Sequence, residues 1–496
     1  MINNLSSEYV NLNKNTREKA QFSAQAVTDI FIRRSGIFYN TANKRIVLKL
    51  NFNIPLVNAL SVNAKSAVRS VKDILEHIET AVSKSNMMFL TEYISLNRRQ
   101  REIRTYMKAH RLIVFIADGS ILPRENGTDQ PMKNAIPFIS PKSMRITIPF
   151  TDGGEITGMV IKQGVTVITG GGYSGKSTLL DAIETGIFDH IPGDGREYVM
   201  SDNSLLKIYA EDGRPVHELN LTPFFRNLPC GVDTESFSTL HASGSVSQAA
   251  NIIEAVCGGS KLLLIDEDKS ATNFMIRDRN MRKIVKNEPI IPFTDRVREL
   301  YLTKSVSTIL VIGGSSEYLK CADIVILMED YTAKDITNDV RRLELLLSPM
   351  EEPPANWTVC RRILTTETTQ PFLFFRSVET ENEKKIILDD YSADITLLTA
   401  LKSGAQMNTL ACMMEQLLCD KDAVNEELIL KLSEIFDKMF DKDGIQLNSL
   451  LPETATRWYE EIRPIDAFCC VNRMRGVNFK KSNKGDTQRK SIKILL

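Results

Sequence analysis

The chain contains the run Gly164-Val-Thr-Val-Ile-Thr-Gly-Gly-Gly-Tyr-Ser-Gly-Lys-Ser-Thr178, in which the local sequence pattern changes abruptly. Val165 to Ile168 predict a short buried strand, because four apolar or β-branched residues are followed by glycines that cannot continue it. After Gly175, apolar residues recur at helical spacing, at Leu179, Leu180, Ile183 and Ile187. A glycine loop between a strand and a helix fits G-x-x-x-x-G-K-S/T, the phosphate-binding pattern of P-loops.

The residue types in this loop match the chemistry of phosphate binding. Glycines let backbone N–H groups close around phosphate oxygens at the positive end of a helix. We expect Lys176 to reach the β and γ phosphates of a nucleotide, and Ser177 to place its hydroxyl on Mg²⁺. The predicted nucleotide-binding residues are Gly170, Gly171, Gly172, Tyr173, Ser174, Gly175, Lys176, Ser177 and Thr178. The alternative is a glycine turn that only packs a helix on a strand.

A second landmark is an apolar strand that ends in carboxylates, Leu262-Leu-Leu-Ile-Asp-Glu-Asp268. Asp266 is placed to complete the Mg²⁺ shell, as a Walker B aspartate does. Glu267 is placed to orient or deprotonate the attacking water, so Glu267 and Lys176 are the predicted catalytic residues. A strand end with solvated carboxylates is the alternative interpretation.

Small hydroxyl residues and glycine precede the predicted helix Gln248 to Val256, in the segment Ser238 to Gln248. Exposed N–H groups at such a helix start predict a second anion site, formed by Ser243, Gly244 and Ser245. A simple helix cap is the alternative.

The order of these motifs resembles the ABC-type ATPase core. In that class, the serine–glycine segment of one subunit covers the γ-phosphate held by the P-loop of another. The resemblance therefore implies a head-to-tail homodimer that binds ATP and Mg²⁺. Ser270 to Asn273 would match the D-loop, whereas Asp268-Lys269 replaces the usual Pro-Thr.

The chain departs from transporter-type members of the class in its histidines. The five histidines are His77, His110, His190, His217 and His241, so none follows Asp266. The switch histidine would fall near Gly313-Gly-Ser-Ser316. Either Ser315 or Ser316 partly replaces it, or hydrolysis relies on Glu267, and we expect slow turnover.

Longer strings are similar to the soluble "predicted ATPase of the ABC class" family, whose known example is a subunit of a kinetoplastid mitochondrial RNA-binding complex. They include Phe115 to Arg124, His190 to Glu197, Ala242 to Ala250, Ala271 to Asp278 and Phe293 to Leu300. The family implies a homodimer with a positively lined pore that can hold RNA. It also implies three parts: an N-terminal α+β accessory domain, here shortened, the P-loop ATPase core of α/β class, and a mainly helical C-terminal domain.

The predicted division has six segments. They are a polar leader (1–23), the accessory domain (24–108), the ATPase core (109–348), a linker (349–358), the C-terminal domain (359–479) and a basic tail (480–496). In the accessory domain we expect helices over 24–34, 64–83 and 89–110 and a strand over 44–52. In the C-terminal domain we expect strands over 371–375 and 384–388 and helices over 395–401, 409–418 and 426–440.

Asp441 to Gly444 suggests an EF-hand, but Met439 and Leu450 would stand at ligand positions, so calcium is rejected.

Composition indicates a globular protein of 496 residues with 43% hydrophobic and 25% charged residues and a net charge of zero. Any nucleic-acid binding must therefore come from local patches, such as the basic residues within 98–111 and 473–493. Solvated charge is the alternative for both patches.

Eight cysteines without C-x-x-C pairs favour reduced thiols in an intracellular protein, and the cytoplasm is favoured over the mitochondrion.

Three function classes compete. The leading one is a soluble ATPase that hydrolyses ATP slowly at a composite dimer interface and couples nucleotide state to RNA binding. The second is a non-enzymatic scaffold that binds ATP structurally and recruits protein partners, favoured by the missing histidine. An ABC transporter subunit is rejected, because no apolar run is long enough for a membrane span.

Overall fold

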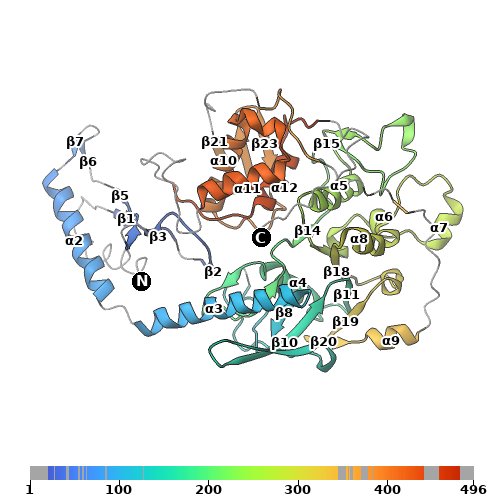
Figure 1. Ribbon diagram of the computed structural model, residues 1–496, viewed down its shortest axis with the longest axis horizontal. Coiled ribbons are helices and arrows are strands. Elements are labelled where there is room, and N and C mark those ends of the chain that lie inside the picture. Colours follow the sequence, from blue (N-terminus) through green and yellow to red (C-terminus); the bar gives the residue numbers. More distant parts are fainter. Residues whose placement is uncertain are drawn as a thin grey trace.

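The computed structural model describes most of the chain, apart from residues near the ends and in several internal stretches (Figure 1). The described residues are 21–26, 28–40, 44–53, 56–58, 61–62, 64–83, 87–126, 128–343, 354–355, 357, 361–369, 378–381, 384–440 and 457–480.

The main sheet has six strands in the order β14-β17-β18-β11-β19-β20. Neighbours are parallel except for β20, which runs antiparallel to β19. The strands are β11 (Val165–Gly170), β14 (Leu206–Ile208), β17 (Leu262–Asp266), β18 (Ser307–Val311), β19 (Ile324–Glu329) and β20 (Thr332–Asp335). Parallel strands that alternate with helices confirm the predicted α/β class.

Alternate residues of these strands enter two separate hydrophobic cores, which also contain α5 (Gly244–Cys257) and α4 (Lys176–Thr185) respectively. Strand residues of the core with α5 include Val165, Val167, Leu263, Ile265 and Leu310. Those of the core with α4 include Ile168, Leu262, Leu264, Ile309 and Val311. Because successive side chains of a strand point to opposite faces, α4 and α5 cover opposite faces of the sheet.

A separate antiparallel sheet has the order β13-β8-β10-β9, and three of its strands precede the P-loop strand in the chain whereas β13 follows it. Its strands are β8 (Leu112–Ala117), β9 (Arg145–Pro149), β10 (Glu155–Lys162) and β13 (Val199–Ser201). Ile103 and Met107 of α3 (Met87–Ala109) pack with Phe115 and Val160 in a third core. The long helix α3 therefore lies along this sheet, and α2 (Ala64–Ser83) extends beyond it (Figure 1).

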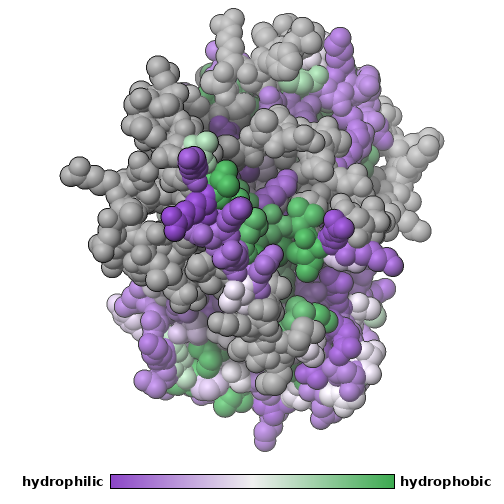
Figure 2. Space-filling model, turned by 90° about the vertical axis from the view of Figure 1, so that its left-hand side faces the viewer, coloured by the Kyte–Doolittle hydropathy of each residue, from purple (hydrophilic) through white to green (hydrophobic). Residues whose placement is uncertain are grey.

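The predicted helix over residues 24–34 is wrong for the described residues of that stretch. The strand β1 (Gln21–Ser23) lies just before this stretch, and β2 (Ile30–Phe31) lies within it and pairs with β12 (Asp189–His190). The Gln25 side chain donates to Tyr459 O and accepts from Gly36 N. Contacts with residues far along the chain thus override a local helical pattern. Among the described residues on the face that Figure 2 shows, hydrophilic side chains lie around a group of apolar ones.

The described C-terminal residues form a small antiparallel sheet, β21-β22-β23, and the helices α10, α11 and α12. Their bounds are β21 (Val378–Glu381), β22 (Lys385–Leu388), β23 (Tyr391–Asp394), α10 (Gly404–Cys419), α11 (Leu428–Met439) and α12 (Pro464–Arg473). The predicted helix over 395–401 is wrong, because these residues form turns in which Ile395 and Leu398 are buried. The predicted strand 371–375 and the Asp441–Gly444 segment lie outside the described residues.

The described residues also form shorter strands and α-helices. The strands are β3 (Ile37–Asn40), β4 (Arg45–Leu48), β5 (Asn51–Asn53), β6 (Leu56–Asn58), β7 (Ser61–Val62), β15 (Val216–Leu219) and β16 (Phe237–Thr239). The helices are α6 (Thr272–Met275), α7 (Arg279–Ile284), α8 (Val297–Lys304) and α9 (Thr337–Arg342). In the part of the chain that the structure describes, no helix is long and apolar enough to cross a membrane.

Candidate nucleotide site

The loop after β11 turns back sharply, and two of its glycines are required by the backbone. Gly170 has a φ of +150°, and a Cβ there would lie 2.3 Å from Met328 O. Gly175 has a φ of +97° and caps α4. Side chains are strained at such angles, so glycine sets this turn. At Gly171 and Gly172 a Cβ would meet no atom of the described residues within 4 Å, chain neighbours apart, so packing within the described chain does not require glycine there.

Lys176, the first residue of α4, folds its ammonium group back over the loop. Its Nζ donates to Gly170 O at 2.7 Å and to Gly171 O at 2.6 Å. The Ser174 Oγ is buried and has no hydrogen-bond partner among the described residues. Buried polar atoms are normally paired, which makes this hydroxyl a candidate ligand contact.

The remaining loop residues face outward. Tyr173 has a φ of +58° and is 98% exposed. Ser177 is exposed and Thr178 is half-buried, in the first turn of α4. Their hydroxyls are therefore accessible to a ligand at the helix N-terminus.

Asp266 and the P-loop lie at the same edge of the main sheet. The strands β11, β18 and β17 are parallel neighbours, so their carboxyl ends meet there. Asp266 ends β17 opposite Val311, and its carboxylate accepts from Asp268 N at 3.2 Å. Burial raises the pKa of Asp266. A cation nearby would favour the charged form, which suits a metal ligand.

Glu267 is held by the loop that follows β18. Its Oε2 accepts from Gly313 N at 2.7 Å and from Gly314 N at 3.0 Å. By the resemblance to transporter-type ABC ATPases, a switch histidine would fall in this loop. Two backbone amides therefore orient the carboxylate where the chain has no histidine.

The serine–glycine segment, residues 243–245, begins α5. Ser243 is the N-cap residue with extended backbone and an exposed side chain, and that side chain makes no capping hydrogen bond. Gly244 and Ser245 form the first turn. Since α4 and α5 cover opposite faces of the sheet, the segment and the P-loop of one chain begin helices on opposite sides.

Sequence reasoning treated Gln248 only as a helix start, but its buried side chain connects two motifs. Its Nε2 donates to Ser270 Oγ at 2.9 Å, and its Oε1 accepts from Ala271 N at 2.8 Å. Ser270 Oγ in turn donates to Asp266 O at 2.7 Å. The helix of the serine–glycine segment is thereby joined to the segment 270–273 and to the end of β17. A buried glutamine in an apolar helix is the signal that could have indicated this.

A sequence model of the ABC_ATPase P-loop domain matches residues 86–359, more than half of the chain. The chain belongs to this ABC ATPase family. Membership supports ATP binding and hydrolysis at a P-loop, with nucleotide and Mg²⁺ as the usual ligands of the class.

Individual relatives of this ABC ATPase are more distant. The uncharacterized protein MJ1628 of Methanocaldococcus jannaschii is 28% identical over 297 residues, and the match covers 57% of this chain and 65% of that relative. The structure of cbiO1 from Clostridium perfringens, part of the ABC transporter complex cbiONQ, is 15% identical with a TM-score of 0.29. That alignment covers 48% of this chain and 96% of cbiO1. An inward-facing conformation of a putative metal-chelate type ABC transporter is 15% identical with a TM-score of 0.28, and the alignment covers 45% of this chain and 82% of that chain.

In this ABC ATPase a hollow of about 490 Å³ lies beside the first turn of α4. Thr178 and Asp181 of the helix line it, together with Arg124 and Arg196. Arg196 is buried and its pKa is lowered to about 10, first by burial and then by the charge of Arg124. The hollow thus continues from the P-loop helix along a polar wall.

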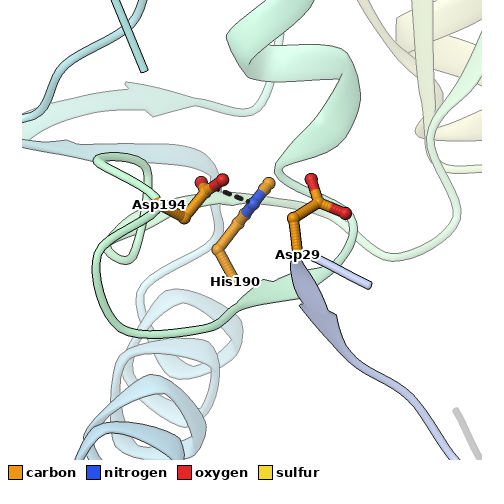
Figure 3. Close-up of side chains that lie close together, drawn as sticks. All are labelled: Asp29, His190 and Asp194. Atoms are coloured by element: carbon orange, nitrogen blue, oxygen red, sulfur yellow. Dashed lines mark ion pairs between the residues drawn. The ribbon is translucent and has the colours of Figure 1, made fainter. Parts of the chain in front are cut away.

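A second cluster in the ABC ATPase, Asp29, His190 and Asp194, has the residue types of a metal site (Figure 3). His190 Nδ1 lies 2.8 Å from Asp194 Oδ2, and Arg124 also contacts that oxygen at 2.7 Å. The charges of Arg124 and Arg196 balance those of the two aspartates. We therefore assign this cluster to a network of charged and polar side chains beside β12, and no metal is needed to explain it.

The basic patches of the ABC ATPase are largely engaged within the chain. Arg98 and Arg99 contact Asp152 at 3.0 and 2.9 Å, and Arg104 contacts Asp189 at 2.7 Å. The prediction that residues 473–493 form one basic end, either contacting nucleic acid or solvated, is wrong at its start, because Arg473 is buried. Lys481 and the basic residues after it lie outside the described residues.

Proposed function

We propose that this ABC ATPase hydrolyses ATP as a head-to-tail homodimer, in which the serine–glycine segment of one chain completes the P-loop site of the other. One observation carries the proposal: α4 and α5 cover opposite faces of one sheet, so the two anion-binding helix starts of a chain do not converge. The orphaned Ser174 hydroxyl and the accessible Ser177 and Thr178 support a phosphate at the P-loop. The nucleoside would extend from Thr178 into the adjoining hollow.

Each group of residues in the site has its own proposed role. Backbone N–H groups of residues 170–178 and Lys176 would bind the phosphates, and Ser177 and Asp266 would hold Mg²⁺. Mg²⁺ supplies charge neutralisation of the phosphate oxygens. Glu267 would orient and deprotonate the attacking water, with its carboxylate positioned by the amides of Gly313 and Gly314. Without a histidine at this loop, we propose slow turnover.

Substitution of Glu267 by glutamine tests the proposal. With the base removed but the shape retained, ATP should accumulate bound and hold the dimer closed, so size-exclusion chromatography should give a dimer with ATP and a monomer without it. Lys176→Ala should remain monomeric with ATP. A Glu267→Gln chain that stays monomeric at saturating ATP would contradict the composite site.

The non-enzymatic scaffold remains the competing function, favoured by the missing histidine. Phosphate release by the wild-type chain at a rate no greater than that of Lys176→Ala would establish it. Activity above that background would exclude it.

RNA binding is the finer part of the proposal and rests on the family resemblance and on basic residues that remain exposed, Arg101, Lys108 and Arg111. The basic tail beyond Lys480 is the second source. Val477 and Phe479 are buried, so a deletion that spares the fold must start after Lys480. This deletion removes Lys481, Lys484, Arg489, Lys490 and Lys493. We expect it to weaken RNA binding and to flatten the dependence of affinity on salt; unchanged affinity and slope would refute a role of the tail.

A further inference from the structure

The serine–glycine segment is held in place at both of its ends by the turn Glu211–Arg214. Gly213 N donates to Ala242 O at 2.7 Å, and Ala242 N donates to Arg214 O at 2.9 Å. On the other side, Ser247 Oγ donates to Gly244 O at 2.9 Å and accepts from Glu211 N at 2.8 Å. The position of Ser243 therefore depends on where this turn lies.

The turn Glu211–Arg214 is itself held by Arg473 of α12 and by Arg475, which lie far later in the chain. Arg473 donates to both carboxylate oxygens of Glu211, at 3.0 and 2.6 Å, and to Asn251 Oδ1 of α5 at 2.9 Å. Arg475, just after the helix, donates to Gly213 O and to Leu240 O, each at 2.9 Å. These two arginines bind the turn and the approach to the serine–glycine segment together.

The network around Arg473 is buried and balanced in charge. Arg214 donates to both oxygens of Glu254 at 2.8 Å, and this pair lies beside the Arg473–Glu211 pair, linked by Asn251. The side chains of the two pairs are between 1 and 10% exposed. Such a network has one well-satisfied arrangement, because any shift leaves a charge unpaired away from water.

We propose that Arg473 and Arg475 are positioning residues for the serine–glycine segment, and that α12 thereby sets the competence of the ATP site that this segment completes on a second copy of the chain. This inference rests on the proposed composite site. It differs from a purely structural role, since loss of the contacts should affect the P-loop of the partner more than the P-loop of the same chain.

The test begins with Arg475→Met, which keeps a long apolar side chain and removes the two donors, and with Arg473→Met as the stronger variant. We expect kcat to fall about tenfold, in the range of couplings carried by packed networks. The Kd of a fluorescent ATP analogue for each variant, measured at a protein concentration low enough to keep the chain monomeric, should stay within about twofold of wild type. The P-loop of the same chain does not contact the two arginines, so its own affinity should be unaffected. A loss of nucleotide affinity in parallel with kcat would reduce the two arginines to general structural residues.

A mixing experiment then decides whether the effect acts across the dimer. Lys176→Ala chains, which keep an intact serine–glycine segment, are mixed with an equal amount of Arg475→Met chains, which keep an intact P-loop. Random pairing makes half of the dimers mixed, each with one complete site, so activity should recover to about a quarter of wild type. Activity equal to the mean of the two separate variants would overturn the proposal.

A control mixture separates this failure from failure of the proposed function. Lys176→Ala is mixed with Ser243→Arg, in which a bulky cation blocks the segment itself. If this control recovers activity and the Arg475→Met mixture does not, the arginines do not act through the segment. If neither mixture recovers activity, the composite site is refuted, and the positioning proposal falls with it.

Discussion

The P-loop and the serine–glycine segment both begin a helix on the main sheet, yet their supports come from very different distances along the chain. Lys176 bonds to carbonyls five and six residues away, and β11 leads directly through the loop into α4. The turn that holds Ala242 and Gly244 is fixed by Arg473, 262 residues beyond Glu211. Local changes should therefore affect chemistry at the P-loop, whereas the serine–glycine segment should respond to changes in distant packing.

The largest expected effect breaks the support of the serine–glycine segment. Glu254→Leu leaves the Arg214 guanidinium buried without its carboxylate, and we expect the free energy of unfolding to fall by roughly 3–5 kcal/mol. Urea denaturation measures this loss. The double variant Arg214→Met with Glu254→Leu removes both charges and should regain much of it. A loss below about 1 kcal/mol for the single variant would show that the pair is not the support we describe.

At the P-loop we expect loss of activity without loss of stability. Lys176→Ala should lower kcat/KM by about 10²–10³-fold, as does removal of one donor to a developing charge. The melting temperature should match that of Lys162→Ala, in which an exposed lysine at the end of β10 is removed. Measured by phosphate release and thermal melting, a large drop in melting temperature for Lys176→Ala alone would remove the contrast between the two regions.

Acid should lower the stability of the region that supports the serine–glycine segment. Burial and then the charge of Arg362 lower the pKa of His217 from its ordinary 6.5 to about 4, and its Nε2 lies 3.1 Å from Met474 O, next to Arg473 in sequence. The unfolded chain takes up this proton at higher pH than the folded chain, so stability should fall between pH 6.5 and 4, by on the order of 3 kcal/mol. Urea midpoints across this range should decline less for His217→Gln; identical declines would assign the effect to other groups.

The smallest expected effect concerns the amides that hold Glu267. Gly314→Pro removes one N–H donor, and we expect kcat to fall about tenfold with KM unchanged, because one charge-assisted hydrogen bond is lost. Gly314→Ala is the matched control: its Cβ would lie 3.6 Å from the Glu267 Oε1, an ordinary contact, and the N–H remains. Equal kcat for the two variants would mean that the amide does not position the carboxylate.

Elements with a strong local period were predictable. The sequence pattern placed a helix over 64–83 and a strand over Val165 to Ile168, and the structure has α2 over Ala64–Ser83 and β11 over Val165–Gly170. The helix predicted over 24–34 was wrong, because β2 pairs with β12 and Gln25 bonds to Tyr459 and Gly36. Arg473 was assigned to a basic end, since charge along a sequence does not reveal a buried partner. The domain division and the roles of the site residues stay predictions.

The sequence by itself determined the P-loop and the strand that ends in Asp266, and through them the ABC ATPase core, because each motif is a contiguous run whose spacing meets a local steric or ligand requirement. Only the tertiary structure decided what holds Glu267 and the serine–glycine segment. The amides of Gly313 and the guanidinium of Arg473 reach their carboxylates across 46 and 262 residues. Such pairs are selected by which groups folding buries together, and residue spacing carries no record of them.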